Sequence, residues 1–497
     1  MKKQKKFVRL LLVILALSFS FSSVVACSKK DGEDATGDVG EVSTITEEGD
    51  QYDEKGYLKD SLPELDYQGD TVTVLCWNSE HSEFEVEYGN NTVDNAIYKS
   101  NKSVEERLNI TLSYEQTRGD VKHTGDYKTK VTNAFNAGEY WDVIASYTRS
   151  TAICAAGGLL MNLGGLEGDN YLDFEKPWWS QDIIDKTSIG NTFYFCTGDI
   201  STNLIQMTYC MYFNAEMLSD MDIQSPYTYV ENNQWTLETL QTICKNIYWD
   251  INENDIADVG DRFGLVGAYY AYPAILHGCD VPIVEKNSAD SFVVSESYKG
   301  QKAQRIMDDI LAVMISDKSA FVDNALSTFT SGKTAFFITE SGTGLNDLST
   351  VTFEYGCVPC PKYDSSQTEY YSTVRQPVTL YGIMANLPKE RIGTATATLE
   401  CLASQRYRQT TPVIFDDCMK HLRSTSVEMT EMLQLIRDTA FFDCARIYSY
   451  ETKYVCDKPG NCLQDGTKWA NYVNGNMGKV EAAVNALSSD LLSIAMQ

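Results

Sequence analysis

The fold of this 497-residue chain is decided by two stretches near its start, TVTVLCW (residues 71–77) and NTVDNAIYKSNKSVEERLNITLSY (residues 91–114). The first is rich in β-branched residues, which favour a strand. In the second, apolar residues recur at helical spacing before the strand-like ITLSY: Val93, Ile97, Val104 and Leu108. Strand, helix and strand in this order predict a βαβ unit, in which helices cover a largely parallel sheet.

The same alternation continues along the chain. WDVIAS (141–146) and TAFFIT (334–339) are predicted strands, and amphipathic helices are predicted near residues 303–314 and 480–491. About 430 residues lie outside the polar start of the chain, which is more than one hydrophobic core accommodates. We therefore expect an α/β protein with two lobes.

The first residues have the three parts of an export signal: basic residues, an apolar stretch at 10–17, and small residues before Cys27. The apolar stretch is shorter than the roughly 20 residues that span a bilayer. Residues 1–26 are therefore predicted to be a signal peptide. The ending VVAC resembles the lipobox of bacterial lipoproteins, which implies that Cys27 carries a lipid; the alternative is a plain secretory signal with an incidental cysteine.

Residues 27–66 are rich in Asp, Glu, Gly, Ser and Thr, and are expected to be a lipidated flexible linker. A linker of this length reaches about 30 to 35 Å. Without residues 1–26 the chain has 36 basic and 69 acidic residues, a net charge of −33. Nucleic acid is therefore excluded as a partner, because phosphate binding needs a positive surface.

The 14 cysteines do not suggest a disulfide framework. Several lie inside apolar runs, where a free cysteine behaves as a small hydrophobic residue: Cys76, Cys196, Cys210 and Cys401. Cys357 and Cys360 form a CxxC, but no second CxxC accompanies it, so a metal or redox centre is disfavoured.

A series of segments resembles the extracellular solute-binding proteins of ABC importers, family 1, of the maltose-binding type, in particular the sugar-binding lipoproteins of Gram-positive bacteria. Besides residues 91–114, the segments are KPWWSQDI (176–183), NTFYFCTGDIS (191–201), MYFNAEML (211–218), SPYTYVENNQWTLETLQTIC (225–244), FTSGKTAFFITES (329–341) and YGCVPCPK (355–362). They occur in the order of that family. Within the segment 225–244, Thr236 is expected to cap a helix.

This resemblance implies a periplasmic-binding-protein-like fold of type II, with crossing strands between two α/β lobes and a ligand cleft between them. The first lobe would comprise residues 67–205 and 373–430, and the second residues 206–372 and 431–497. It also implies a monomer on the outer face of the cell membrane that captures a carbohydrate, with an oligosaccharide as the expected ligand, and delivers it to permease subunits. Neither catalysis nor a required cofactor is expected.

DINENDIADVGD (250–261) has the spacing of a twelve-residue calcium loop. Its candidate oxygen donors are the side chains of Asp250, Asn252, Asn254, Asp258 and Asp261 and the carbonyl of Ile256. Asp255 replaces the usual turn glycine, although Asp tolerates the left-handed conformation. The alternative to a structural calcium site is an acidic surface turn that binds no metal.

Ligands of open α/β sheets lie beyond the carboxyl ends of the strands, and sugar sites combine aromatic faces with polar groups. The strand-end rule selects Trp77, Asn78, Tyr147, Glu340 and Ser341 as ligand-binding candidates. The family resemblance adds Trp178, Trp179, Asp199, Tyr269, Tyr270, Tyr272 and Arg375. Trp178 and Trp179 could instead pack against each other.

The chain has none of the common sequence signatures of hydrolases or phosphate-binding loops, and its four histidines are far apart. A glycosidase pair of carboxylates has no fixed sequence spacing, so a surface glycoside hydrolase stays open as an alternative. A peptide-binding or adhesion lipoprotein is the third hypothesis.

Overall fold

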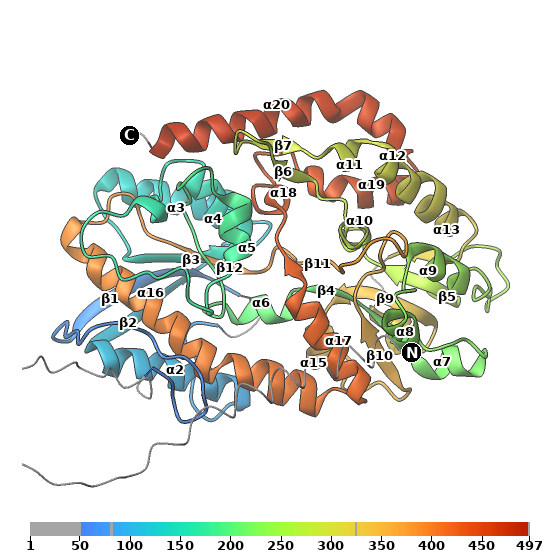
Figure 1. The fold of residues 1–497 in the computed structure, drawn as a ribbon, viewed down its shortest axis with the longest axis horizontal. Helices are drawn as coiled ribbons and strands as arrows, with labels where there is room; N and C mark the ends of the chain where they lie inside the picture. Colours follow the sequence, from blue (N-terminus) through green and yellow to red (C-terminus); the bar gives the residue numbers. More distant parts are fainter. Residues whose placement is uncertain (1–50, 80–82, 324–325, 496–497) are drawn as a thin grey trace, which may run out of the picture. The chain divides into compact units, whose positions relative to one another are not determined.

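The predicted βαβ unit begins the first of two main sheets in the computed structural model, which describes residues 51–79, 83–323 and 326–495 (Figure 1). Helix α2 (Thr92–Leu108) connects the two strands, and the Asn91 side chain caps it by accepting a hydrogen bond from the Asp94 amide. The sheet has the strand order β12-β3-β1-β2, with the bounds Thr379–Gly382, Val143–Tyr147, Asp70–Trp77 and Ile110–Thr117. Only β12 is antiparallel to its neighbour.

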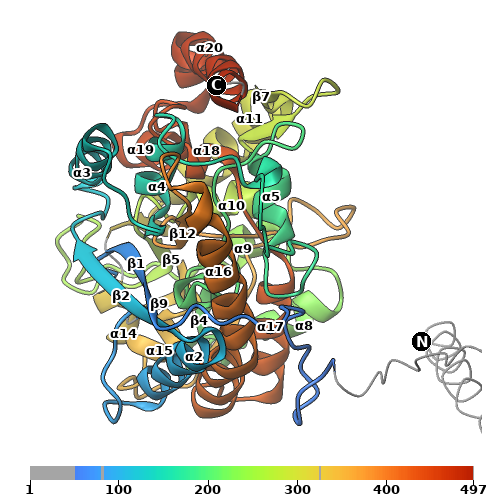
Figure 2. The same cartoon turned by 90° about the vertical axis from the view of Figure 1, so that its left-hand side faces the viewer.

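Helices cover both faces of this first sheet (Figures 1 and 2). Successive residues of a strand point to opposite faces. Val74 and Cys76 accordingly pack in one core with α2 and α16 (Lys389–Gln409), whereas Leu75 packs in the other core with α3 (Thr124–Ala137) and α4 (Thr148–Ala155). The sheet and these helices form the first lobe.

The second main sheet has the order β10-β4-β9-β5-β8, with the bounds Tyr355–Val358, Tyr209–Asn214, Thr334–Glu340, Phe263–Gly267 and Ala320–Val322. It is mixed rather than largely parallel, because β4 is antiparallel to both of its neighbours. The register pairs Tyr209, the first residue of β4, with Glu340, the last residue of β9. Strand β4 therefore enters the sheet at the edge where β9 ends.

Short helices surround this sheet and complete the second lobe. The predicted cap is confirmed: the Thr236 hydroxyl accepts a hydrogen bond from the Thr239 amide and begins α9 (Leu237–Cys244). The predicted helix near residues 303–314 is also present, as a continuous run of α12, η3 and α13. The remaining elements of the lobe are α7 (Ala215–Asp220), α8 (Pro226–Glu231), α10 (Pro273–Gly278), β6 (Val284–Lys286), β7 (Phe292–Val294), α11 (Glu296–Lys299), α12 (Gln301–Gln304), η3 (Arg305–Leu311), α13 (Ala312–Ser316), α14 (Leu326–Thr330) and α15 (Thr343–Asn346).

The chain passes between the lobes three times. The first passage follows η2 (Leu163–Gly165) and α5 (Gln181–Thr187) and contains α6 (Thr202–Gln206). The second contains β11 (Ser372–Thr373). The third begins with η4 (Val413–Leu422) and α17 (Val427–Asp438), which lies beside β10 of the second lobe, and ends in β13 (Ala440–Phe441), which pairs with β11 in parallel.

The chain ends in a C-terminal module, residues 444–495. It consists of α18 (Cys444–Ile447), η5 (Val455–Asp457), α19 (Lys458–Asp465) and the long α20 (Trp469–Ala495), which contains the predicted closing helix. Helix α20 lies along β7 of the second lobe (Figure 1). Its far end reaches the first lobe, where the Tyr194 hydroxyl donates a 2.6 Å hydrogen bond to the Leu491 carbonyl. The module therefore contacts both lobes.

Cys27 and most of the predicted signal and linker lie outside the described residues. The described chain begins at residue 51, so residues 51–66 of the predicted linker have defined contacts. Asp60 lies 3.4 Å from the Arg408 guanidinium, and Arg107 donates a 2.9 Å hydrogen bond to the Leu62 carbonyl. Polar linkers become ordered when the folded domain supplies partners for them, which composition alone does not reveal.

All cysteines of the described chain are buried free thiols, as expected for small hydrophobic residues in the core. Burial raises the pKa of Cys154, for example, to about 12. A thiol with such a pKa is protonated at neutral pH and therefore unreactive. Among the described helices, none combines the length and the apolar character that a membrane span requires.

Candidate functional site

Two pockets lie on opposite sides of the crossing segments. Thr208 of the first crossing forms a β-bridge with Val374 of the second, and the Arg375 amide donates a 2.7 Å hydrogen bond to the Met207 carbonyl. Because side chains alternate along an extended segment, Val374 and Arg375 point to different sides. Val374 lines what we call the rear pocket, and Arg375 lines the front pocket.

The front pocket has a volume of about 220 Å³ and is formed by both lobes and the C-terminal module. Its lining residues are Trp77, Asp120, Val121, Tyr147, Arg149, Tyr269, Tyr270, Arg375, Gln376, Pro377 and Asp457.

Aromatic side chains form two walls of the front pocket. Trp77 ends β1 and Tyr147 ends β3, and because these strands are parallel neighbours their rings meet, with centroids 5.5 Å apart. The Trp77 indole donates a 2.8 Å hydrogen bond to the Thr379 hydroxyl, which fixes the ring. Tyr269 and Tyr270 follow β5 of the second lobe, with ring centroids 5.4 Å apart. Aromatic residues of both lobes therefore line the front pocket, but Trp77 and Tyr147 are only 1% and 4% exposed, whereas Tyr269 is 37% exposed.

Paired charges complete the front pocket. The Arg149 guanidinium lies 3.0 Å from the Asp457 carboxylate. Arg375 forms an ion pair with Glu340 and stacks over the Tyr270 ring, with the guanidinium carbon 4.8 Å from the ring centroid. Arginine in such pairs holds donors and acceptors in a fixed plane, which suits recognition of neighbouring hydroxyl groups.

Two further groups belong to residues that line the front pocket. The Nε of Arg149 is buried and has no hydrogen-bond partner within the described chain. An unpaired buried donor costs free energy, and because this atom has almost no accessible surface, it is not itself a contact point for a ligand. Burial raises the pKa of Tyr147 to about 12, against the opposing effect of Arg149 and Arg375. The Tyr147 phenol is therefore protonated at neutral pH and can donate a hydrogen bond.

A second, smaller pocket of about 120 Å³ adjoins the front pocket. Tyr270 lines both pockets, and Glu340, the partner of Arg375, lines the smaller one. The Thr339 hydroxyl donates a 3.0 Å hydrogen bond to the Glu340 carboxylate. The two pockets therefore share Tyr270 and are linked by the Arg375–Glu340 ion pair.

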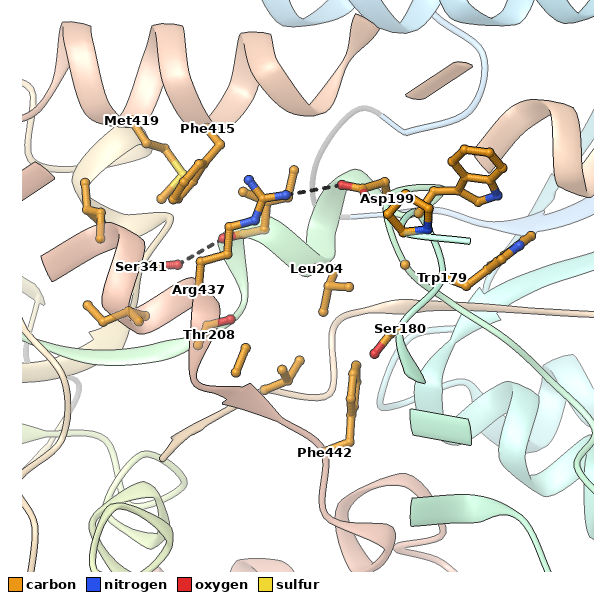
Figure 3. Close-up of a pocket in the computed structure, with 18 residues that line it drawn as sticks. Trp179, Ser180, Asp199, Leu204, Thr208, Ser341, Phe415, Met419, Arg437 and Phe442 are labelled. Atoms are coloured by element: carbon orange, nitrogen blue, oxygen red, sulfur yellow. Dashed lines mark hydrogen bonds and ion pairs between the residues drawn. The ribbon is translucent and has the colours of Figure 1, made fainter. Parts of the chain in front are cut away.

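The rear pocket has a volume of about 260 Å³ and a different character (Figure 3). Most of its lining is apolar: Pro177, Trp178, Trp179, Leu204, Ile205, Val374, Phe415, Met419, Leu433, Ile436, Ala440 and Phe442. The Asp199 carboxylate accepts a 2.6 Å hydrogen bond from Thr411 and lies 3.5 Å from Arg437. Burial raises the pKa of Asp199, although Arg437 and Thr411 oppose that shift.

The two tryptophans of the rear pocket are held by one carboxylate. Trp178 and Trp179 donate hydrogen bonds of 3.1 and 2.9 Å from their indole nitrogens to the two oxygens of Glu400 on α16. Burial raises the pKa of Glu400 to about 7, against these hydrogen bonds. The pair is thus tied into the first lobe, and Trp178 is fully buried.

The candidate residues chosen from the sequence separate into distinct places. Trp77, Tyr147, Tyr269, Tyr270 and Arg375 line the front pocket, and Glu340 lines the adjoining one. The rear pocket receives Trp178, Trp179, Asp199 and Ser341. Asn78 is exposed next to Trp77 and lines neither front nor rear pocket. Tyr272 is fully buried, and its hydroxyl donates a 2.9 Å hydrogen bond to the Phe321 carbonyl.

Sequence reasoning missed several residues of the front pocket. Arg149 lies two residues after the predicted strand-end residue Tyr147, so the strand-end rule could have included it. Gln376 similarly follows Arg375. Asp457 had no local signal, because it is more than 300 residues away from Arg149 and meets it only in the folded chain.

The predicted calcium loop folds back on itself in the second lobe. The Asp250 carboxylate accepts hydrogen bonds from the amides of Asn254 (3.2 Å) and Asp255 (2.7 Å), and Asp255 has a φ of 63°, the left-handed conformation expected for it. Asp258 accepts hydrogen bonds from the Asn252 and Asn254 side chains. Within the described ranges, no group of three or more His, Cys, Asp or Glu side chains has the arrangement of a metal site. Any ion here would need amide and carbonyl oxygens in addition to carboxylates.

No protein-family model matches this sequence, and no curated protein matches it. Solved structures do match. The cyclic alpha-maltosyl-1,6-maltose binding protein from Arthrobacter globiformis is similar over 86% of this chain and 100% of its own, with a TM-score of 0.57 and 11% identity. The galacto-N-biose-/lacto-N-biose I-binding protein of the ABC transporter from Bifidobacterium longum is similar over 86% and 98%, with a TM-score of 0.56 and 11% identity.

A further match is the ABC substrate-binding protein from Listeria monocytogenes in complex with cycloalternan. It is similar over 84% of this chain and 98% of its own, with a TM-score of 0.53 and 11% identity. The chain therefore has the two-sheet α/β fold of the maltose-binding type of solute-binding protein, and the resemblance inferred from the sequence is confirmed at the level of the fold.

Proposed function

We propose that this chain is the extracellular substrate-binding lipoprotein of an ABC importer, which captures a carbohydrate in the front pocket and delivers it to permease subunits. The observation that carries the proposal is the front pocket itself. Aromatic residues of both lobes line this space together with the Arg149–Asp457 pair and Arg375, whose partner Glu340 lines the adjoining pocket. Sugars present apolar C–H faces between rings of hydroxyl groups, so this combination suits them.

The fold supports the same proposal, because the three solved structures named above are binding proteins and two are described as parts of ABC systems. Binding without chemistry is the expected activity. The lobes, taken as residues 67–205 with 373–430 and 206–372 with 431–497, would move about the crossing segments when the ligand binds. We expect a monomer with no required cofactor.

Calorimetric titration with mono- and oligosaccharides tests the proposal. We expect at least one saccharide to bind, with its composition unchanged when the mixture is analysed by chromatography afterwards. Release of smaller sugars would instead favour the surface glycoside hydrolase. Binding of peptides and not of sugars would favour the adhesion or peptide-binding alternative.

The anchor is tested separately. The proposed lipid attachment at Cys27 rests on the sequence, where the signal-like residues 1–26 precede a polar linker. We expect the exported protein to incorporate labelled palmitate and to fractionate with membranes. The Cys27→Ala variant should lose both properties, and a label that persists in this variant would contradict the anchor.

A structural calcium ion in the loop 250–261 is a further part of the proposal. Asp250, Asn252, Asn254, Asp258 and Asp261 supply side-chain oxygens at the spacing of such loops, with the Ile256 carbonyl as a sixth donor. Asp258 already has a pKa below its ordinary value because Asn254, Gly260 and Asn252 donate hydrogen bonds to it. Its carboxylate is therefore ionised, as calcium binding requires.

A further inference from the structure

The C-terminal module contributes one residue to the lining of the front pocket. Asp457, the last residue of η5, lines the pocket and lies 3.0 Å from Arg149 of α4. The two side chains are 11% and 20% exposed, so the pair is largely shielded from bulk solvent. This part of the lining is therefore a guanidinium–carboxylate pair contributed by the first lobe and the module.

Contacts with the second lobe hold the segment around Asp457 in place. The buried Tyr298 hydroxyl donates a 2.8 Å hydrogen bond to the Val455 carbonyl, two residues before Asp457. The Trp469 indole donates a 3.1 Å hydrogen bond to the Tyr298 carbonyl. Gly460 packs against the Tyr269 carbonyl so closely that a Cβ would not fit. Buried contacts of Val455, before Asp457, and of Gly460, after it, therefore fix the position of Asp457.

The volume that the front pocket and the adjoining pocket offer to a ligand is small. Pockets that hold drug-sized molecules have volumes of about 300 to 1,000 Å³. The front pocket has about 220 Å³, and the adjoining pocket beyond Tyr270 has about 120 Å³. These volumes accommodate one sugar ring in the front pocket and a second ring in the adjoining pocket, near Glu340.

We propose that the Arg149–Asp457 pair is the end wall of the ligand site, so that the site takes a saccharide of one or two rings with its terminal ring against this pair. This inference rests on the proposed function and adds the size of the ligand to it. Arg149 and Asp457 both line the front pocket, so the guanidinium donates to a ring hydroxyl and the Asp457 carboxylate accepts from the neighbouring hydroxyl. Asp457 thus determines specificity by binding a hydroxyl group of the terminal sugar ring.

The first test is a length series. Calorimetric titration uses glucose-, galactose- and N-acetylglucosamine-based saccharides of one to six rings. For the sugar series that binds, we expect the tightest binding at one or two rings and about 10-fold weaker binding from three rings upward. Tighter binding of longer members overturns the inference and leaves the proposed function intact. Absence of binding at every length overturns both.

The second test removes the wall. Asp457→Ala should weaken binding of the preferred short saccharide by about 10-fold, the loss of a charge-assisted hydrogen bond. It should also narrow the affinity ratio between short and long members of the series. A merely structural residue would weaken all lengths equally, and an unchanged ratio would overturn the assignment. Asp457→Asn, which keeps the shape and one acceptor, should retain more of the length preference than Ala does.

Glu481→Gln serves as the matched control. Glu481 is a carboxylate of the same module in an ion pair of similar length, 2.6 Å from Lys299, but it faces the second lobe and does not line the pocket. This variant should leave both affinity and length preference within about twofold of the wild type. Equal effects of Glu481→Gln and Asp457→Asn would show that the module acts through its general stability, which would contradict the wall.

Discussion

The front and rear pockets share the same crossing segments and differ in almost everything else. Val374 and Arg375 are neighbours in the chain, yet one faces apolar side chains and the other faces aromatic rings and ion pairs. The front pocket offers paired charges and aromatic side chains to a ligand. The rear pocket offers mainly packing surface where the lobes meet. The comparison teaches that two adjacent residues of a crossing segment can line chemically different pockets, because their side chains point to opposite sides.

The largest expected effect concerns the rear pocket. Trp178→Ala should lower the free energy of unfolding by about 3 to 5 kcal/mol, because it removes a fully buried indole and one of the donors to Glu400. Chemical denaturation measures this loss. Sugar affinity, measured well below the unfolding midpoint, should stay within about threefold of the wild type. A loss of sugar affinity as large as that of a front-pocket variant would contradict the proposal that only the front pocket binds the sugar.

The next prediction uses the two neighbours directly. Arg375→Ala should weaken sugar binding by about 100-fold, because it removes the stacked guanidinium and leaves Glu340 without its ion-pair partner. Val374→Ala, the matched control, should lower stability by about 1 to 2 kcal/mol and leave affinity nearly unchanged. Calorimetric titration of both variants with the same saccharide decides the matter. Reversed effects would place the ligand in the rear pocket.

A third prediction concerns the carboxylate behind the rear pocket. Burial raises the pKa of Glu400 to about 7 in the folded protein, above its ordinary value of 4.5. The folded state therefore binds this proton more tightly than the unfolded state does. The resulting stability is fully present below pH 4.5 and is lost as the pH rises through about 7, a change on the order of 3 kcal/mol.

Glu400→Gln tests this dependence, because the amide does not titrate in this range. Denaturation curves between pH 4.5 and 8 should show a smaller decrease of stability for the variant than for the wild type. Sugar affinity should not follow this titration, since Glu400 contacts Trp178 and Trp179 and not the front pocket. An identical pH profile in the two proteins would contradict the assignment.

The smallest expected effect lies away from both pockets. Millimolar calcium should raise the unfolding temperature by about 2 to 4 °C if the loop 250–261 binds it, because an ion bound only by the folded state stabilises that state. Asp250→Ala should abolish the shift, whereas magnesium should produce less of it. Sugar affinity should not change. A calcium effect that survives in Asp250→Ala would place the ion elsewhere.

The sequence predicted the fold from local periodicity. The βαβ unit, the helix cap at Thr236 and the strand at 334–339 all rest on neighbouring residues, whose spacing and side-chain chemistry are visible in one dimension. The structure places Trp77 and Tyr147 beside each other for the same reason: parallel neighbouring strands end at one edge of a sheet, so a residue at a strand end can be assigned to that edge from its position alone.

What the sequence could not determine was which side of a crossing segment each side chain would face, and what distant segment would lie opposite it. The sequence analysis named Trp178, Asp199, Ser341 and Arg375 together as ligand-binding candidates. In the structure the first three line the rear pocket and Arg375 lines the front pocket, on the other side of the crossing segments. Asp457 meets Arg149 because the C-terminal module folds back over the second lobe, a contact between residues far apart in the chain. Such contacts depend on how whole elements pack, and that packing is fixed by the total burial of many side chains and not by any local pattern.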